Sequence, residues 1–387
     1  MNFVYLSPHF PPSYYQFCYH LNQLGVNVLG LADEAYDRLR PELQRSLREY
    51  YRVGDMHVYE HLLKACGHFT HCYGKIDRID SHNEYWLETE ARLREDFNIS
   101  GPKRREIKKM KHKSQMKQIF SKAGVDVARG EVVHSLGEAL TFIETVGYPV
   151  VAKPDSGVGA ANTFKIDTEN ELISFFKQKP PIDYLMEEFI FGRIYTFDGL
   201  TDKEGRLVFF TSHTYSQGIM ETVNDDSLIY YYSLREIPSD LEEAGRKVAG
   251  AYKIKERFFH FEFFKRERDQ EIVALEVNMR PPGGLTTDMF NYANDIDIYK
   301  EWANVITGNH FSKTYTRPFH CCYVSRKAYK VYAHSHDEIL ETFGERVVQH
   351  ESISGIFSAA LGNYGYLIRS ADLDEIIEMA GFIQQVE

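Results

Sequence analysis

The chain is poor in cysteine, with only five among its 387 residues. An odd, scattered set in a chain of this length argues against a disulfide framework. It predicts reduced thiols and therefore a cytoplasmic protein. The five are Cys18, Cys66, Cys72, Cys321 and Cys322.

Long hydrophobic runs are also missing. No apolar stretch approaches the length that a membrane-spanning helix needs, so the sequence predicts no membrane association of that kind. Residues 1–6 form a short strand-like run and lack the basic region of a signal peptide. Internal repeats and low-complexity segments are absent as well.

Positive charge is the third shortage. Lys and Arg number 45 against 56 Asp and Glu, which gives a formal net charge of −11. A phosphate backbone needs a basic surface, so this balance argues against general nucleic-acid binding. The basic stretch 103–113 is a local exception that predicts a solvated helical face or a lysine reaching a polyphosphate. A nucleic-acid patch is disfavoured there because no aromatic residues interleave.

What is present is an ordinary globular composition, 43% hydrophobic and 26% charged, in a chain long enough for two or three domains. The first hundred residues alternate strand and helix patterns, with a strand over 3–6, a helix over 14–25 and a strand over 26–31. Such β-α-β spacing predicts a parallel sheet covered by helices. A break at 98–102 predicts a domain boundary.

One short segment holds two cysteines and two histidines, which are Cys66, His68, His71 and Cys72. These residue types could bind zinc. The pattern, however, predicts a helix over 58–66 that runs into a buried strand over 69–73, and side chains on such a path point in different directions. Ordinary packing is therefore preferred over a metal site.

Two strand patterns near residue 270 form the most informative feature. Residues 261–264 and 272–278 are mostly apolar and flank a charged turn, which predicts a β-hairpin. Glu262 and Glu276 lie near the middle of the two arms. Isolated carboxylates are costly in an apolar sheet, and like charges repel unless a cation lies between them.

Asn278 and Arg280 continue the face of Glu276, because alternate residues of a strand share a side. Carboxylate and amide oxygens suit Mg²⁺ that already carries phosphate, and an Arg beside them suits phosphate or carboxylate. A structural salt-bridge cluster is the alternative, although Arg280 would neutralise only part of it. His260 is expected to be a core histidine or an outer partner of the ligands, and not to share a face with Glu262.

A strand that contains Lys153 leads into a glycine-rich turn at residues 155–162. Gly157 and Gly159 would let backbone N–H groups approach phosphate oxygens, and Lys153 would add a point charge. The segment lacks the spacing of a P-loop, and a strand instead of a helix follows it, which excludes a dinucleotide fingerprint. An ordinary hairpin is the alternative.

The run Glu187-Glu188-Phe189-Ile190 ends another strand, near an expected hinge between two lobes. At such a hinge, backbone N–H and C=O groups can read a purine. An acidic side chain can accept a hydrogen bond from the exocyclic amine or from a ribose hydroxyl. Two exposed acids at a strand end are the alternative interpretation.

In this order the segments resemble the ATP-grasp superfamily over roughly residues 100–310. Pro281-Pro282-Gly283-Gly284 resembles its carbamoyl-phosphate-synthase-like and carboxylate–amine ligase branch. The resemblance implies that ATP phosphates contact Lys113 and Lys153 and are covered by the loop of Gly157 and Gly159. It implies that adenine or ribose contacts Glu187, Glu188, Phe189 and Ile190. It also implies that Mg²⁺ or Mn²⁺ is held by Glu262, Glu276 and Asn278, and that Arg280 steadies the transferred group.

One position departs from the family pattern. Many relatives carry a second Glu just after the hinge glycine, where it contacts ribose. Here Gly192 is followed by Arg193, Ile194 and Tyr195. The ribose contact is then either absent or supplied by Glu187 alone.

The resemblance also implies the architecture, a combination of α/β and α+β parts. An N-terminal parallel-sheet α/β domain would occupy residues 1–100, and a two-lobed ATP-grasp domain residues 101–313. The small lobe would span about 114–190 and the large lobe about 191–313, with a small C-terminal α+β region at 314–387.

The function that the resemblance implies is an ATP- and Mg²⁺-dependent ligase. It would activate a small-molecule carboxylate as an acyl-phosphate for attack by an amine or another nucleophile. A kinase-like phosphotransferase, a biotin-carboxylase-like enzyme and a non-catalytic nucleotide-binding module are the alternatives. A homodimer is possible, and neither nucleic acid nor membrane is an expected partner.

Overall fold

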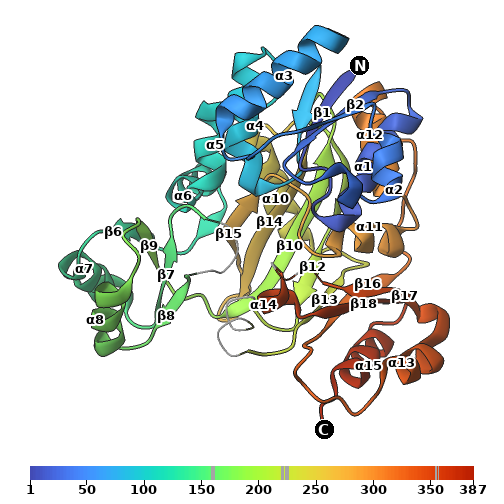
Figure 1. Cartoon of the computed structure of the whole chain (residues 1–387). Helices are drawn as coiled ribbons and strands as arrows, with labels where there is room; N and C mark the ends of the chain where they lie inside the picture. Colours follow the sequence, from blue (N-terminus) through green and yellow to red (C-terminus); the bar gives the residue numbers. More distant parts are fainter. Residues whose placement is uncertain (158–161, 219–221, 223–225, 354, 356) are drawn as a thin grey trace.

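The computed structural model describes residues 1–387 except 158–161, 219–221, 223–225, 354 and 356. It combines an N-terminal α/β part with two further sheets (Figure 1). The fold class predicted from the sequence is confirmed. In the described ranges, no helix has both the length and the apolar character required to cross a membrane.

The N-terminal part is built on a parallel sheet. Its strands are β1 (Asn2–Leu6), β2 (Asn27–Ala32), β3 (Glu49–Arg52) and β4 (Arg78–Asp80). They pair in the order β3-β2-β1-β4, so the predicted β-α-β arrangement is confirmed. Phe3 and Tyr5 pack on one face of this sheet and Val4 and Leu6 on the other, as strand alternation requires.

Four helices cover the two faces of this sheet, together with short 3₁₀ turns. The helices are α1 (Tyr15–Gln23), α2 (Pro41–Ser46), α3 (Tyr59–Tyr73) and α4 (Leu87–Asp96). The turns in this part are η1 (Pro12–Tyr14), η2 (Tyr36–Arg38) and η3 (Glu84–Trp86).

Helix α3 corrects one prediction, because residues 69–73 are helical and not a strand. Leu62, Ala65, Cys66 and Phe69 are its buried residues, and their spacing is that of one helical stripe. Cys66 is thus buried while Cys72 is exposed. Among the described residues, no group of three or more His, Cys, Asp or Glu could hold a metal ion.

A small antiparallel sheet projects at the left of Figure 1. Its strands are β6 (Gly130–Val133), β7 (Val150–Pro154), β8 (Phe164–Ile166) and β9 (Tyr184–Glu188), in the order β6-β9-β7-β8. Two helices, α7 (Leu136–Val146) and α8 (Glu169–Gln178), pack on it. Ser135 caps α7 by accepting a hydrogen bond from the Glu138 N–H, and Gly147 with φ of 80° ends the helix.

The large sheet contains ten strands among the described residues. They are β5 (Asp126–Val127), β10 (Gly192–Thr201), β11 (Leu207–Thr211), β12 (His213–Tyr215), β13 (Tyr230–Ser233), β14 (Phe258–Arg266), β15 (Ile272–Asn278), β16 (His320–Arg326), β17 (Val347–Ser352) and β18 (Tyr364–Ser370). The order is β17-β18-β16-β13-β12-β10-β14-β15-β5, with β11 on β10. The sheet therefore continues across the predicted boundary near residue 313, through the β13–β16 pair.

The remaining helices surround the large sheet. They are α5 (Arg104–Lys111), α6 (Lys113–Lys122), α10 (Ser239–Tyr252), α11 (Thr286–Asn294), α12 (Ile298–Gly308), α13 (His336–Phe343), α14 (Ser358–Leu361) and α15 (Leu373–Gln384), with the 3₁₀ turn η4 (Gly344–Arg346). The basic stretch 103–113 forms α5, which buries Ile107 and Met110. Of the five lysines in this stretch, Lys108 and Lys109 are exposed, Lys103 and Lys111 are half-buried, and Lys113 at the start of α6 is buried.

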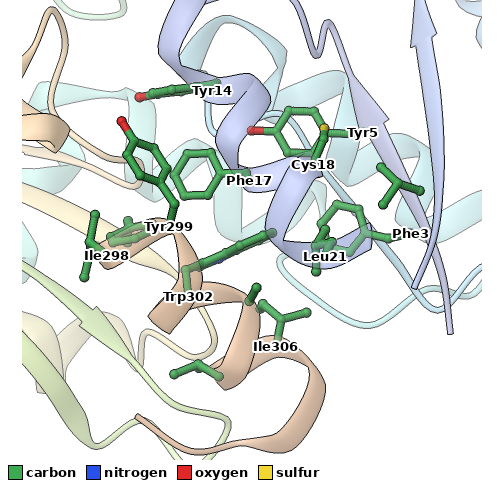
Figure 2. Packing of buried hydrophobic residues seen from close by; sticks show 14 of the residues in the cluster. Phe3, Tyr5, Tyr14, Phe17, Cys18, Leu21, Ile298, Tyr299, Trp302 and Ile306 are labelled. Atoms are coloured by element: carbon green, nitrogen blue, oxygen red, sulfur yellow. The ribbon is translucent and has the colours of Figure 1, made fainter. Parts of the chain in front are cut away.

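An aromatic cluster joins the N-terminal part to helix α12 (Figure 2). Trp302 of α12 makes edge-on contacts with Phe3 at 5.7 Å and with Phe17 of α1 at 5.0 Å between ring centres. Trp302 is 1% exposed. Burial of such large rings is the main favourable term in docking these parts together.

A buried ion network forms a second junction. Arg257, just before β14, pairs with Asp80 of β4 at 2.7 Å and donates to the Met279 carbonyl at 2.8 Å. Glu90 and Arg94 of α4 pair at 2.8 Å beside it. Burial opposes ionisation of Asp80, but Arg257 and its other neighbours outweigh this and hold its pKa below the usual range.

We expect Arg257→Ala to lower the free energy of unfolding by about 3–5 kcal/mol, because the buried acids Asp80 and Glu90 would lose one of the two arginines that they share and keep only Arg94. Urea denaturation measures this. Arg246→Ala, which removes an exposed pair with Glu242, should cost less than about 1 kcal/mol. Equal effects of the two substitutions would contradict the importance of the buried network.

Candidate active site

A cavity of about 730 Å³ lies between the small sheet and the large sheet. Ten of the residues predicted from the sequence line it: Lys113, Lys153, Glu187, Glu188, Phe189, Ile190, Glu262, Glu276, Asn278 and Arg280. The Gly157 carbonyl accepts a hydrogen bond from Lys113, which is one of these ten residues. Gly159 lies outside the described residues. The cavity thus brings together nearly all of the predicted site.

The hairpin of β14 and β15 places Glu262 directly opposite Glu276, and His260 opposite Asn278. A bulge follows Glu262. Two carboxylates and an amide oxygen therefore face one end of the cavity. These hard oxygen donors fit Mg²⁺ and leave coordination positions for other oxygens, so the residues could hold the ion together with a phosphate.

His260 was expected not to share a face with Glu262, and this prediction is wrong. Its Nε2 lies 3.1 Å from the Glu262 Oε1. The reason is simple, since residues two apart in a strand point to the same side. His260 is therefore a direct partner of a predicted metal ligand.

Behind His260 lies a buried carboxylate that the sequence reasoning missed. Asp198 of β10 contacts His260 Nδ1 at 2.5 Å and His213 Nδ1 at 2.8 Å. Burial opposes both charges, yet their mutual attraction lowers the pKa of Asp198 to about 2 and raises that of His260 to about 9. Glu262 also has a lowered pKa because His260 outweighs the effect of burial. A lone Asp within the apolar run 197–200 was the available signal.

Lys153 and Lys117 both form ion pairs with the carboxylate of Glu187. All three residues are buried. Burial opposes the charge of Glu187, but the two lysines keep its pKa below the usual range. Lys117 was not predicted, although it lies one helical turn after Lys113 on α6.

At the hinge, Glu188 is bound by Arg129, whose Nε and backbone N–H each donate to it at 2.8 Å. Beyond it, Ile190 packs with Ala128, Val273 and Phe264 in an apolar cluster. This cluster supplies apolar lining at the hinge end of the cavity, which suits a flat aromatic ring.

Ile194 pairs across strands with Phe264 and also lines the cavity. Just after the hinge glycine, where many relatives carry a second Glu, this chain therefore presents the apolar side chain of Ile194. Since the carboxylate of Glu187 is engaged by two lysines, a ribose contact from Glu187 stays a prediction.

The stem of the glycine-rich loop is attached to the start of α6. The Asp155 carboxylate accepts from the Ser114 N–H at 2.8 Å, and the Asp155 carbonyl accepts from the Lys113 N–H at 2.8 Å. Lys113 Nζ donates to the Gly157 carbonyl at 3.3 Å and lies 3.6 Å from the Glu276 carboxylate. One lysine therefore links the loop stem to the acidic end of the cavity.

Arg280 follows β15 and points toward the N-terminal part. Its Nε lies 3.4 Å from the Glu84 carboxylate, and one terminal N–H donates to the Pro281 carbonyl at 2.9 Å. Burial raises the pKa of Glu84 to about 7, although Arg280 opposes this. Glu84 was missed in the sequence because no local pattern separates it from the surface acids around it.

The Asp198–His260 pair predicts a pH dependence of stability. The raised pKa of His260 means that its contribution is complete below the ordinary value of 6.5 and is lost as the pH rises through about 9. The lowered pKa of Asp198 means that its contribution is lost only as the pH falls toward 2. Between pH 6.5 and 9, wild type should lose up to about 3 kcal/mol relative to His260→Gln.

Urea unfolding at a series of pH values, with a chelator present, measures this difference. An identical pH profile for wild type and His260→Gln would show that the pair carries no such linkage.

Parts of the chain are similar in sequence to known proteins. Residues 146–288 match the family model described as ATP-grasp domain. An L-arginine-specific L-amino acid ligase of Bacillus subtilis is 24% identical over 247 residues, which cover 60% of this chain and 58% of that ligase. An arginine-specific carbamoyl phosphate synthase large chain of Halalkalibacterium halodurans is 32% identical over 90 residues, 23% of this chain and 9% of that protein.

Among solved structures, an L-amino acid ligase from Bacillus licheniformis superposes with a TM-score of 0.76 at 13% identity, over 100% of this chain and 97% of that one. This likeness shows a shared fold along the whole chain. The family match over residues 146–288, which include β7 to β9, the hinge and the hairpin of β14 and β15, identifies an ATP-grasp domain within the chain.

Proposed function

We propose that the protein is an ATP- and Mg²⁺-dependent ligase that joins a small-molecule carboxylate to an amine. The cavity between the small and the large sheet supports this most directly. Its acidic end presents Glu262, Glu276 and Asn278, its hinge end offers an apolar slot, and cationic side chains lie between them. A nucleotide would thus lie with its base at the hinge and its phosphates at the acidic end.

The chemistry requires positioning and charge neutralisation more than covalent help from the protein. A carboxylate oxygen of the first substrate attacks the γ-phosphorus, and the bond to the ADP oxygen breaks. The amine then attacks the acyl carbon, phosphate leaves and the nitrogen loses a proton. Lys113 and Lys153 would neutralise phosphate oxygens, and Arg280 would hold the substrate carboxylate and the acyl-phosphate.

Mg²⁺ held by the two carboxylates and the amide oxygen would supply Lewis-acid polarisation of the phosphate oxygens. Water exclusion from the phosphates is proposed for the loop that starts at Asp155, of which residues 158–161 lie outside the described residues. Exclusion matters because an acyl-phosphate hydrolyses wastefully when water reaches it.

Amino acids are the proposed substrate class for both positions. The support is the relative from Bacillus subtilis, which is an L-arginine-specific L-amino acid ligase. The five cysteines are free, which suits action in the cytoplasm. A homodimer remains a prediction.

A paired screen would test the function. Purified protein, ATP and Mg²⁺ are incubated with amino acids and small acids two at a time, and phosphate release is recorded with mass spectrometry of the products. ADP, phosphate and an amide support the ligase. A stable phosphorylated product indicates a kinase, turnover with bicarbonate and biotin indicates a carboxylase, and binding indifferent to Mg²⁺ indicates a non-catalytic module.

Glu276→Gln should abolish Mg²⁺-dependent ADP formation while leaving the fold intact, because an amide is a much weaker Mg²⁺ ligand than a carboxylate. Coupled ADP detection and circular dichroism measure the two effects. Glu267→Gln is the matched control, since Glu267 lines the same cavity outside the metal-facing group. Unchanged turnover in Glu276→Gln would refute the metal assignment.

Lys153→Ala should weaken nucleotide binding, because the phosphates lose a buried cation and Glu187 keeps only Lys117. The measurement is the thermal shift produced by a non-hydrolysable ATP analogue. Lys177→Ala, on the exposed side of α8, should keep the wild-type shift. Equal shifts in Lys153→Ala and wild type would count against a phosphate role.

A further inference from the structure

The negative charges of Glu262 and Glu276 are balanced by cationic side chains of different kinds. Glu262 contacts His260 at 3.1 Å, and His260 is in turn held by Asp198 at 2.5 Å. Glu276 instead lies 3.6 Å from the ammonium of Lys113. One countercharge is a short side chain inside the sheet, and the other is the end of a long flexible one.

His260 has little freedom to leave Glu262. It belongs to β14, which pairs with β10 on one side and β15 on the other, and its second ring nitrogen is bound by a buried carboxylate. A histidine anchored in this way orients a ligand and stays beside it, as outer partners of metal ligands do.

Lys113 is placed differently. It begins α6, and its Nζ lies between the Glu276 carboxylate and the carbonyl of Gly157 in the loop stem. Its backbone is fixed by Asp155, while four rotatable bonds separate that backbone from the charge. The ammonium can therefore move between the acidic end of the cavity and the loop without any change in the fold.

From this difference we infer that Lys113 is an exchangeable countercharge that couples nucleotide binding to metal binding. The inference rests on the proposed function. Without nucleotide, Lys113 occupies the neighbourhood of Glu276 and opposes entry of a free divalent cation. Nucleotide phosphates draw the ammonium toward themselves, which releases Glu276 to the metal. Glu262 keeps its His260 partner throughout.

The attraction between the Lys113 ammonium and the Glu276 carboxylate sets the expected change in metal affinity. A cation 3.6 Å from a carboxylate in a largely buried site is a strong competitor for any ion that needs the same oxygen. Removing that cation should tighten binding of the free metal and weaken binding of the nucleotide. The gain in metal affinity that nucleotide produces should then shrink.

Mn²⁺ binding followed by electron paramagnetic resonance tests this without any turnover. The free ion is titrated into the full-length protein with and without the non-hydrolysable ATP analogue AMPPNP. Lys113→Met should bind Mn²⁺ alone about tenfold more tightly than wild type, and the enhancement by AMPPNP should fall by a similar factor. Lys122→Met, at the exposed end of the same helix, removes the same charge and should behave as wild type.

Asp198→Asn provides the contrast. It loosens His260 and should weaken Mn²⁺ binding by the same factor with and without AMPPNP, so the enhancement stays at the wild-type value. Lys113→Gln is a second replacement should the Met variant fail to fold.

Different outcomes would contradict the proposed function and the exchange by Lys113. If wild type binds no Mn²⁺ even with AMPPNP present, the proposed function fails. If it binds Mn²⁺ with AMPPNP but neither Lys113 variant binds the free ion more tightly, the exchange by Lys113 is overturned. An enhancement lost equally in Asp198→Asn would overturn it as well.

Discussion

The pairing of Glu262 with Glu276 across β14 and β15 is the constraint that organises this site. Two carboxylates held opposite each other in a largely apolar sheet are stable only with positive charge close by. His260 and Lys113 provide that charge in the structure, and Asp198 fixes the first of them. The proposed Mg²⁺ site depends on this local arrangement.

The N-terminal part completes the site from the other side. Arg257 ties Asp80 to the Met279 carbonyl, next to Arg280, and Glu84 reaches Arg280 itself. The aromatic packing of α1 against α12 holds these parts together. The end of the cavity where a substrate would meet the phosphate is therefore built jointly by segments far apart in the sequence, and docking of the N-terminal part is a condition for assembling it.

Features set by local pattern were predictable, and those set by distant pairing were not. The hairpin, the parallel sheet and the capped helix α7 follow from residues close together in sequence. Lys117 and Glu84 gain their roles from partners at least 70 residues away, and Asp198 gains its role from His213 and His260 on other strands. No local rule distinguishes the three from ordinary polar residues. The wrong prediction of a strand over 69–73 had another cause. Five mixed apolar and polar residues fit both the strand period and the helix period when they are read without the preceding helix.

The most direct test of the account is a crystal structure of the protein with Mg²⁺ and AMPPNP. We expect the ion between Glu262, Glu276 and Asn278, the base beside Ile190, and the Lys113 ammonium on phosphate oxygens instead of on Glu276. A vacant cavity under these conditions, or carboxylates turned toward other partners with the ion held elsewhere, would contradict the central claim.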